Sequence, residues 1–79
     1  MGEKKIVGFR TESGAEYAVK DGKAMRLEGS PFSPRIDYST VPDATWMDLA
    51  TTVEVGGYAY MTKGIKFRQT TPVVEVYYG

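Results

Sequence analysis

Short runs in which apolar and polar residues alternate, each ended by a turn that contains glycine or proline, make up most of this 79-residue chain. Neighbouring side chains of a strand point to opposite faces, so this alternation predicts β-strands with one apolar face. It indicates six or seven short strands and no clear helix, within a single domain that spans residues 1–79. We expect an all-β fold, either a small barrel or a curled antiparallel sheet of the size of SH3-like domains.

We expect strands at residues 4–11, 16–20, 24–28, 58–62, 65–70 and 73–78. Two other segments have weaker patterns. Residues 29–45 contain three prolines and no sustained period, which indicates one long Pro-rich loop. Residues 45–55 are ambiguous. Alternation from Met47 to Val55 favours a strand, whereas Pro42-Asp43 is typical of the start of a short helical turn. We favour an extended conformation there.

The hairpin within residues 16–28 has two candidate registers. A two-residue Asp21-Gly22 loop pairs Ala18 with Met25 and divides the apolar residues between the two faces. A three-residue loop, with Gly22 in the left-handed conformation, pairs Tyr17 with Met25 instead. We favour this second register because it collects the apolar side chains on one face.

The same choice arises in the hairpin within residues 58–70. A three-residue loop, Thr62-Lys63-Gly64, places Met61 opposite Ile65 and Ala59 opposite Phe67 on the core face. A two-residue Lys63-Gly64 turn would instead group Tyr58, Tyr60, Ile65 and Phe67 together as core. We favour the three-residue loop, which leaves two tyrosines and two cations in solvent: Tyr58, Tyr60, Lys66 and Arg68. Such an aromatic and basic strip can stack nucleic-acid bases or contact an acidic partner.

One core is expected from the side chains that share the inward phase of their strands. Its expected members are Val7, Phe9, Tyr17, Val19, Met25, Leu27, Val53, Met61, Ile65, Phe67, Val74 and Val76. In this arrangement Phe67→Ala would destabilise the domain by about 3–5 kcal/mol.

The residue types that most enzymes use are missing, since the chain has no Cys, His or Asn. It therefore has no disulfide, no thiolate nucleophile and no Ser-His or Cys-His pair. Asp37, Asp43 and Asp48 lie close in sequence, but solvated loop charges explain them better than acid–base chemistry or a Mg²⁺ or Ca²⁺ site. We expect no enzymatic activity, no cofactor and no metal.

Ten basic and ten acidic residues give a formal net charge of zero. No overall field draws such a chain to nucleic acid or anionic lipid, so any such binding must come from a local patch. Residues 1–6 are charged where an export signal would be apolar, and no apolar run is long enough to cross a membrane. We expect a cytoplasmic protein without a membrane partner.

The Pro-rich loop offers a second candidate binding surface in Phe32, Arg35 and Tyr38, because aromatic residues and arginine are enriched at binding hot spots. Alternatively, Phe32 and Trp46 cap an open barrel end while Arg35 pairs with an acid beside it, Asp37. We favour a buried, capping Trp46.

The C-terminal residues 77–79 raise a separate question about oligomeric state. An exposed edge strand there would pair with a second copy and give a homodimer, whereas ordinary edge packing would leave the chain monomeric. Both outcomes fit the sequence.

Short motifs along most of the chain carry a family resemblance. They are Phe9-Arg10-Thr11-Glu12-Ser13-Gly14 leading to Tyr17, then Arg26-Leu27, the single Trp46, Gly56, and Thr70-Thr71-Pro72-Val73-Val74-Glu75-Val76. Together they resemble a class of small proteins encoded by actinobacteria and their phages. The resemblance implies a phage or mobile-element context and assigns no activity to any residue.

These observations lead to two hypotheses of function. The first is a non-enzymatic binding module, phage-encoded and acting by occupying the surface of a host protein, with a host or phage protein as its partner. The alternative is a small β-barrel that binds nucleic acid or nucleotides through the aromatic and basic strip.

Overall fold

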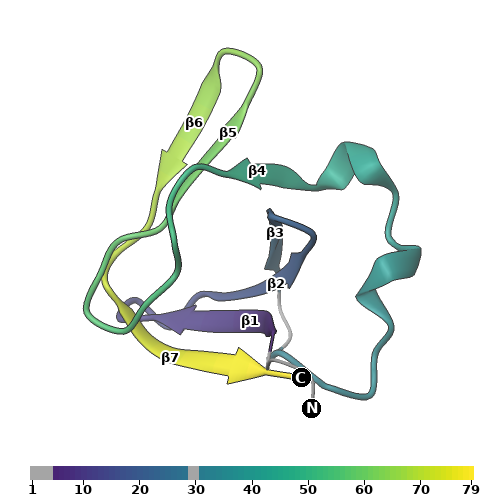
Figure 1. Cartoon of the computed structure of the whole chain (residues 1–79), viewed down its shortest axis with the longest axis horizontal. Helices are drawn as coiled ribbons and strands as arrows, with labels where there is room; N and C mark the ends of the chain where they lie inside the picture. The colour runs from purple at the N-terminus through teal and green to yellow at the C-terminus, as the bar shows by residue number, and fades with distance from the viewer. Residues whose placement is uncertain (1–4, 29–30) are drawn as a thin grey trace.

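Seven antiparallel strands form a single sheet in the computed structural model, which describes residues 5–28 and 31–79. The sheet order is β6-β5-β4-β3-β2-β1-β7, so β7 returns from the end of the chain to pair with β1 (Figure 1). The strands are β1 (Ile6–Thr11), β2 (Glu16–Lys20), β3 (Lys23–Leu27), β4 (Met47–Leu49), β5 (Tyr60–Lys63), β6 (Lys66–Gln69) and β7 (Val73–Tyr78). The predicted all-β class is confirmed, as is the predicted strand at residues 73–78.

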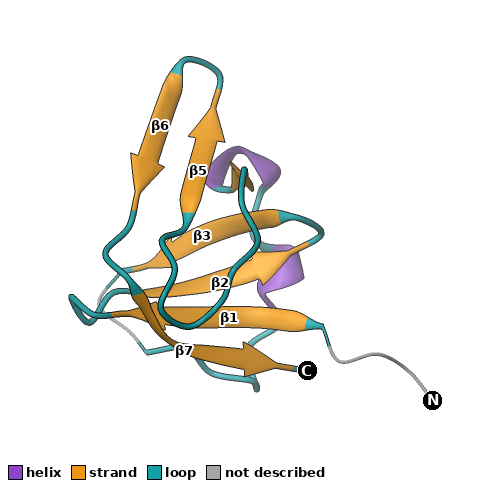
Figure 2. Cartoon of the chain, turned by 60° about the vertical axis from the view of Figure 1, so that its left-hand side comes forward, coloured by secondary structure: helices purple, strands orange, loops and turns teal. Residues whose placement is uncertain are grey.

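The sheet is curled and open, and it does not form a closed barrel. Strands β6 and β7 are its two edges and do not pair with each other. Part of the gap is bridged by the loop before β5, because the Gly56 N–H donates to the Val73 carbonyl and the Val73 N–H donates to the Gly57 carbonyl, each at 2.8 Å. Figure 2 shows this loop passing in front of β1 and β2. The curled-sheet form of the prediction therefore describes this fold.

The β2–β3 hairpin turns through the two-residue loop Asp21-Gly22, in which both residues have positive φ, 49° and 76°. This is the type I′ geometry that Asp-Gly favours. Ala18 consequently pairs with Met25, and the favoured three-residue loop is wrong. That expectation assumed a single buried face. Ala18 and Ala24 lie on opposite faces of the hairpin and neither is exposed, so both faces are covered.

Two β-bulges set the side-chain phase between β1 and β7. Val7 is the extra residue on β1 and Val74 is the extra residue on β7. The second bulge turns Val73 into the core, where it is almost fully buried, and leaves Val74 exposed. The predicted core position of Val74 is wrong for this reason.

The core lies on the concave side of the sheet. Its buried members are Phe9, Tyr17, Ala24, Val53, Ala59, Met61 and Val73, with Ile6, Ala15, Val19, Met47, Leu49 and Val76 packed against them. Phe9 and Tyr17 stack with ring centroids 4.8 Å apart. The predicted core positions of Phe9, Tyr17, Val53 and Met61 are confirmed, whereas those of Ile65 and Phe67 are wrong because both side chains are exposed.

Two 3-10 turns, η1 (Tyr38–Thr40) and η2 (Asp43–Thr45), lie between β3 and β4. The second begins directly after Pro42, as the Pro42-Asp43 signal indicates. Trp46 follows it and is buried as expected, and its indole N–H donates to the Val41 carbonyl at 3.3 Å. Between Trp46 and Val55 only Met47–Leu49 is a strand, so the strand favoured as far as Val55 is correct for its first part alone.

No helix within the described residues is long and apolar enough to cross a membrane.

Candidate functional site

The β5–β6 hairpin projects from the body of the sheet, and its tip rises well above the other strands (Figures 1 and 2). Strand β4 flanks it on one side only, since β6 is a sheet edge. All four residues of β6 are exposed. Apart from Met61 and Ala59, which are buried in the core, this hairpin is open to solvent.

The turn of this hairpin explains why its side chains face as they do. Lys63 pairs with Lys66, so the loop consists of Gly64 and Ile65. Gly64 has φ +62° at the first loop position, the arrangement of a type II′ turn with glycine followed by any residue. Neither register considered from the sequence is present. Compared with the favoured three-residue loop, β5 keeps its faces, with Ala59 and Met61 buried, whereas β6 exchanges its faces, so that Phe67 leaves the core face.

The observed register separates the predicted aromatic and basic strip. Tyr60 pairs with Gln69, whereas Arg68 pairs with the core residue Met61. Lys63 and Lys66 therefore share the concave face with Arg68, and Phe67 shares the convex face with Tyr60. Tyr58 and Tyr60 are 51% and 37% exposed, and Phe67 is 73% exposed.

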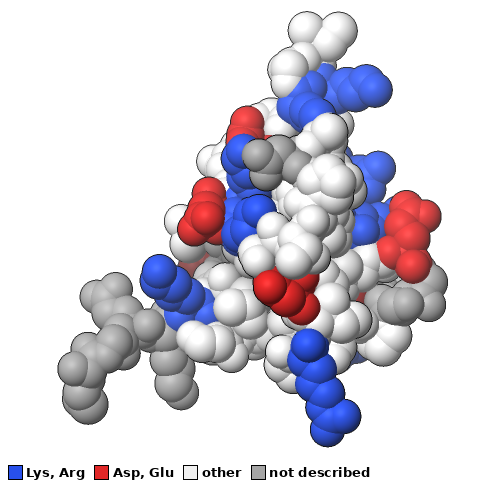
Figure 3. Space-filling model, turned by 90° about the vertical axis from the view of Figure 1, so that its right-hand side faces the viewer, with Lys and Arg blue, Asp and Glu red and all other residues white. Residues whose placement is uncertain are grey.

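The hairpin is strongly basic as well as apolar. Residues 55–74 contain Lys63, Lys66 and Arg68 but no acid. In Figure 3, blue basic atoms adjoin the white tip of the protrusion at the top of the molecule. Ile65 is one of the two loop residues that end this hairpin, and its side chain is fully exposed. An aliphatic tip, an exposed ring and three cations thus lie on one protruding element.

The base of the hairpin is fixed by Ala59 and Thr70. The Thr70 N–H donates to the Ala59 carbonyl at 3.0 Å, and the Ala59 N–H donates to the Thr70 hydroxyl at 3.0 Å. That hydroxyl donates in turn to the Thr71 carbonyl at 2.8 Å. Ala59 and Thr70 are both buried, so the exposed part of the hairpin rests on an ordered base.

A cavity of about 260 Å³ opens beside this base on the concave face. It is lined by two arginines and by residues that carry hydroxyl groups, with no acid among them: Thr11, Ser13, Ala15, Tyr17, Arg26, Arg68, Gln69, Thr70 and Thr71. Such a lining suits an anionic group. Arg26 belongs to a resemblance motif but was not predicted as a site residue, because only the curled sheet brings β3 and the end of β6 to the same cavity.

The predicted residues of the Pro-rich loop occupy a different region. Phe32 stacks on Tyr38 and on Tyr77, with ring centroids 5.5 and 4.9 Å apart. The Tyr38 hydroxyl accepts the Ser33 N–H at 3.0 Å. Phe32 and Tyr38 are therefore brought together against the sheet, whereas Arg35, between them in the sequence, is exposed.

The same loop borders a cavity of about 280 Å³, which Phe32, Ile36 and Tyr38 line together with residues of the sheet. Asp37 accepts hydrogen bonds from the Ser39 N–H and hydroxyl. These bonds lower the pKa of Asp37. Among the described residues Arg35 forms no ion pair with Asp37, and no three acids gather as metal ligands would.

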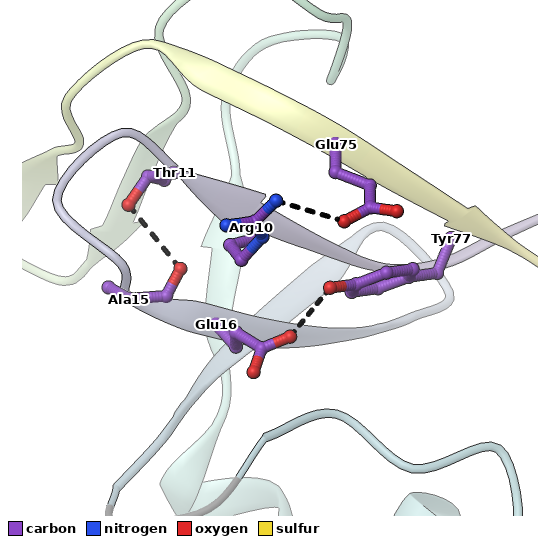
Figure 4. A network of polar contacts seen from close by, with 6 residues as sticks. All are labelled: Arg10, Thr11, Ala15, Glu16, Glu75 and Tyr77. Atoms are coloured by element: carbon purple, nitrogen blue, oxygen red, sulfur yellow. Dashed lines mark hydrogen bonds and ion pairs between the residues drawn. The ribbon is translucent and has the colours of Figure 1, made fainter.

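A polar network ties β7, β1 and β2 together on the convex face (Figure 4). Arg10 forms an ion pair with Glu75 at 3.2 Å, and the Tyr77 hydroxyl donates to a Glu16 carboxylate oxygen at 2.6 Å. Burial, together with the hydrogen bond to Glu16, raises the pKa of Tyr77 to about 12. With its ring on Phe32 and its hydroxyl on Glu16, Tyr77 is held within its own chain.

Comparison with known proteins adds no relative: no protein-family model, curated protein or solved structure matches this chain. The resemblance to small actinobacterial and phage proteins stays a prediction.

Proposed function

We propose that this protein is a non-enzymatic protein-binding module whose contact surface is the β5–β6 hairpin. One observation carries the proposal: Phe67 is 73% exposed and Ile65 is fully exposed on an element that also bears Lys63, Lys66 and Arg68. Clustered exposed apolar residues are costly in water unless a partner covers them.

The charge of the hairpin favours a particular kind of partner. Three cations without an acid between residues 55 and 74 form a local basic patch on a chain of zero net charge. An acidic protein with an apolar pocket would complement both features, because charge steers the encounter and burial of the ring and the aliphatic tip supplies affinity. The resemblance stated above would make that partner a host protein.

Nucleic acid is the alternative ligand, favoured by the exposed Tyr58 and Tyr60 and by the same cations. The structure supports nucleic acid less well than a protein as the ligand of the hairpin. Stacked bases and phosphates need rings and cations on a shared surface, and the observed pairing places Tyr60 on the face opposite to Lys66 and Arg68.

Selection from a library of random short peptides tests the proposal with a defined probe. We expect enriched peptides that are rich in acidic and apolar residues and whose affinity falls about tenfold or more with Phe67→Ser. Ile36→Ser is the matched control, since Ile36 is also an exposed apolar residue but lies in the Pro-rich loop.

Two results would contradict the proposal. Peptides whose binding depends on Ile36 rather than Phe67 would move the site to the Pro-rich loop. Binding of labelled single-stranded or duplex DNA that weakens steeply with salt, without any enriched peptide, would make the alternative correct.

A further inference from the structure

We infer that the partner of the hairpin is an extended acidic peptide segment that adds as a strand to the open edge of β6 and places a carboxylate in the cavity lined by Arg26 and Arg68. This inference rests on the proposed function and specifies how the partner is recognised. Extended segments that add to a sheet edge gain affinity from main-chain hydrogen bonds and specificity from alternate side chains.

The turn determines which backbone groups of β6 are available. Lys66 and Lys63 flank a two-residue loop, so the Lys66 N–H faces β5. Hydrogen-bonded and non-hydrogen-bonded pairs alternate along an antiparallel ladder. The N–H and C=O groups of Phe67 and Gln69 therefore face the open edge. Among the described residues no other strand lies on that side of β6.

The side chains beside this edge define the sequence that fits it. A strand added to β6 places its own side chains alternately on the convex face, next to Phe67, and on the concave face, next to Lys66 and Arg68. Apolar side chains suit the first row and acidic ones the second. The fitting segment alternates apolar and acidic residues.

The cavity at the base of β6 supplies a defined place for one carboxylate. Arg68 lies on the concave face of β6 and lines this cavity, with Arg26 contributed by β3. The hydroxyl-bearing residues Ser13 and Thr71 line it too. Guanidinium groups bind carboxylates through charge-assisted, often bidentate, hydrogen bonds.

A second copy of this chain fits the edge poorly. Two β6 strands pairing about a twofold axis would bring Lys66 and Arg68 of each copy together, and like charges on facing strands destabilise pairing. The same cations complement an acidic segment. Charge therefore selects a different chain as the occupant.

The test uses the tightest peptide from the library selection and the full-length protein. Two versions of the peptide carry backbone N-methyl groups at alternate residues. One version is methylated at the odd-numbered positions and the other at the even-numbered positions. Only one phase can remove N–H groups that point to β6, so we expect one version to lose binding and the other to keep it. Arg26→Gln and Arg68→Gln should each lower the affinity about tenfold. Lys5 is an exposed cation that precedes β1, so Lys5→Gln should leave the affinity unchanged.

The outcomes separate this inference from the proposed function. Equal binding of both N-methylated peptides, with Phe67→Ser still harmful, would leave a hairpin that binds peptides and would overturn strand addition. Unchanged affinity in Arg26→Gln would overturn the carboxylate site. Self-association of the unliganded chain that Phe67→Ser abolishes, measured by sedimentation equilibrium, would make a second copy the occupant and overturn the inference.

Discussion

The ring of Phe32 lies directly over the α-carbon of Gly8. A Cβ atom added to Gly8 would come within 2.7 Å of the ring and within 2.8 Å of the Tyr17 carbonyl oxygen. Gly8 pairs with Ala18 and with Tyr77 in the sheet. The Pro-rich loop thus packs on the convex face through a strand position without a side chain.

Gly8→Ala should therefore destabilise the protein by about 1–3 kcal/mol, because the new methyl group overpacks a site closed partly by backbone. Chemical denaturation measures the change. Gly57→Ala is the matched control. Its Cβ would meet only Glu54, at 3.3 Å from a flexible side chain, so its unfolding free energy should stay near the wild-type value. Equal stability of the two variants would contradict the packing of Phe32 on Gly8.

Phe9→Ala and Phe67→Ala should differ strongly in their effect on the free energy of unfolding. Phe9 is fully buried and stacked on Tyr17, so its truncation should cost about 3–5 kcal/mol. Phe67 is 73% exposed, so its truncation should change stability by less than about 0.5 kcal/mol. Thermal and urea denaturation of both variants decide the point. A large loss in Phe67→Ala would restore the core position first expected for it.

Thr70→Val should destabilise the base of the hairpin by about 1–3 kcal/mol, because the buried Ala59 N–H loses its acceptor while side-chain volume is kept. Amide hydrogen exchange of β5 and β6 should accelerate more than that of β1 and β2. Thr52→Val, at an exposed threonine, should leave both stability and exchange unchanged. Uniform acceleration across the sheet would show that the base does not control the hairpin.

The pH dependence of stability should carry a contribution from Tyr77. Its folded-state pKa of about 12 lies above the ordinary value of 10.0. The stabilisation is therefore fully present below pH 10 and is lost as pH rises from about 10 to about 12. Urea denaturation across that window should show a shallower fall for Tyr77→Phe than for wild type, with Tyr58→Phe as the control for removal of an exposed hydroxyl. Parallel curves for Tyr77→Phe and wild type would contradict this assignment.

The strands were predictable from local pattern, but their registers were not. Alternation and turn glycines located the strand of residues 73–78 and the left-handed conformation of Gly22 and Gly64. The choice of loop length assumed one buried face, and Ala18 shows that the second face of β2 is covered as well. On that face Phe32 of the Pro-rich loop packs against Gly8, which pairs with Ala18. No local sequence rule reveals this contact.

The prediction of the candidate site depended in the same way on the position of the loop in the β5–β6 hairpin. Placing Ile65 in the turn rather than in the strand exchanges the faces of β6 relative to β5, so Phe67 lies on the surface instead of in the expected core. The dipeptide Gly64-Ile65 was the available signal, since a glycine followed by any residue suits a type II′ turn. Arg26 had no comparable signal, because its proximity to Arg68 arises only from the curl of the sheet.

The central claim, that the β5–β6 hairpin is the binding surface, is tested most directly by amide chemical-shift mapping of the isotope-labelled protein with the selected peptide. We expect the largest perturbations at residues 60–71, with smaller ones near Arg26 and none at residues 31–40. Perturbations confined to the Pro-rich loop, with the amides of Phe67 and Gln69 unmoved, would contradict it.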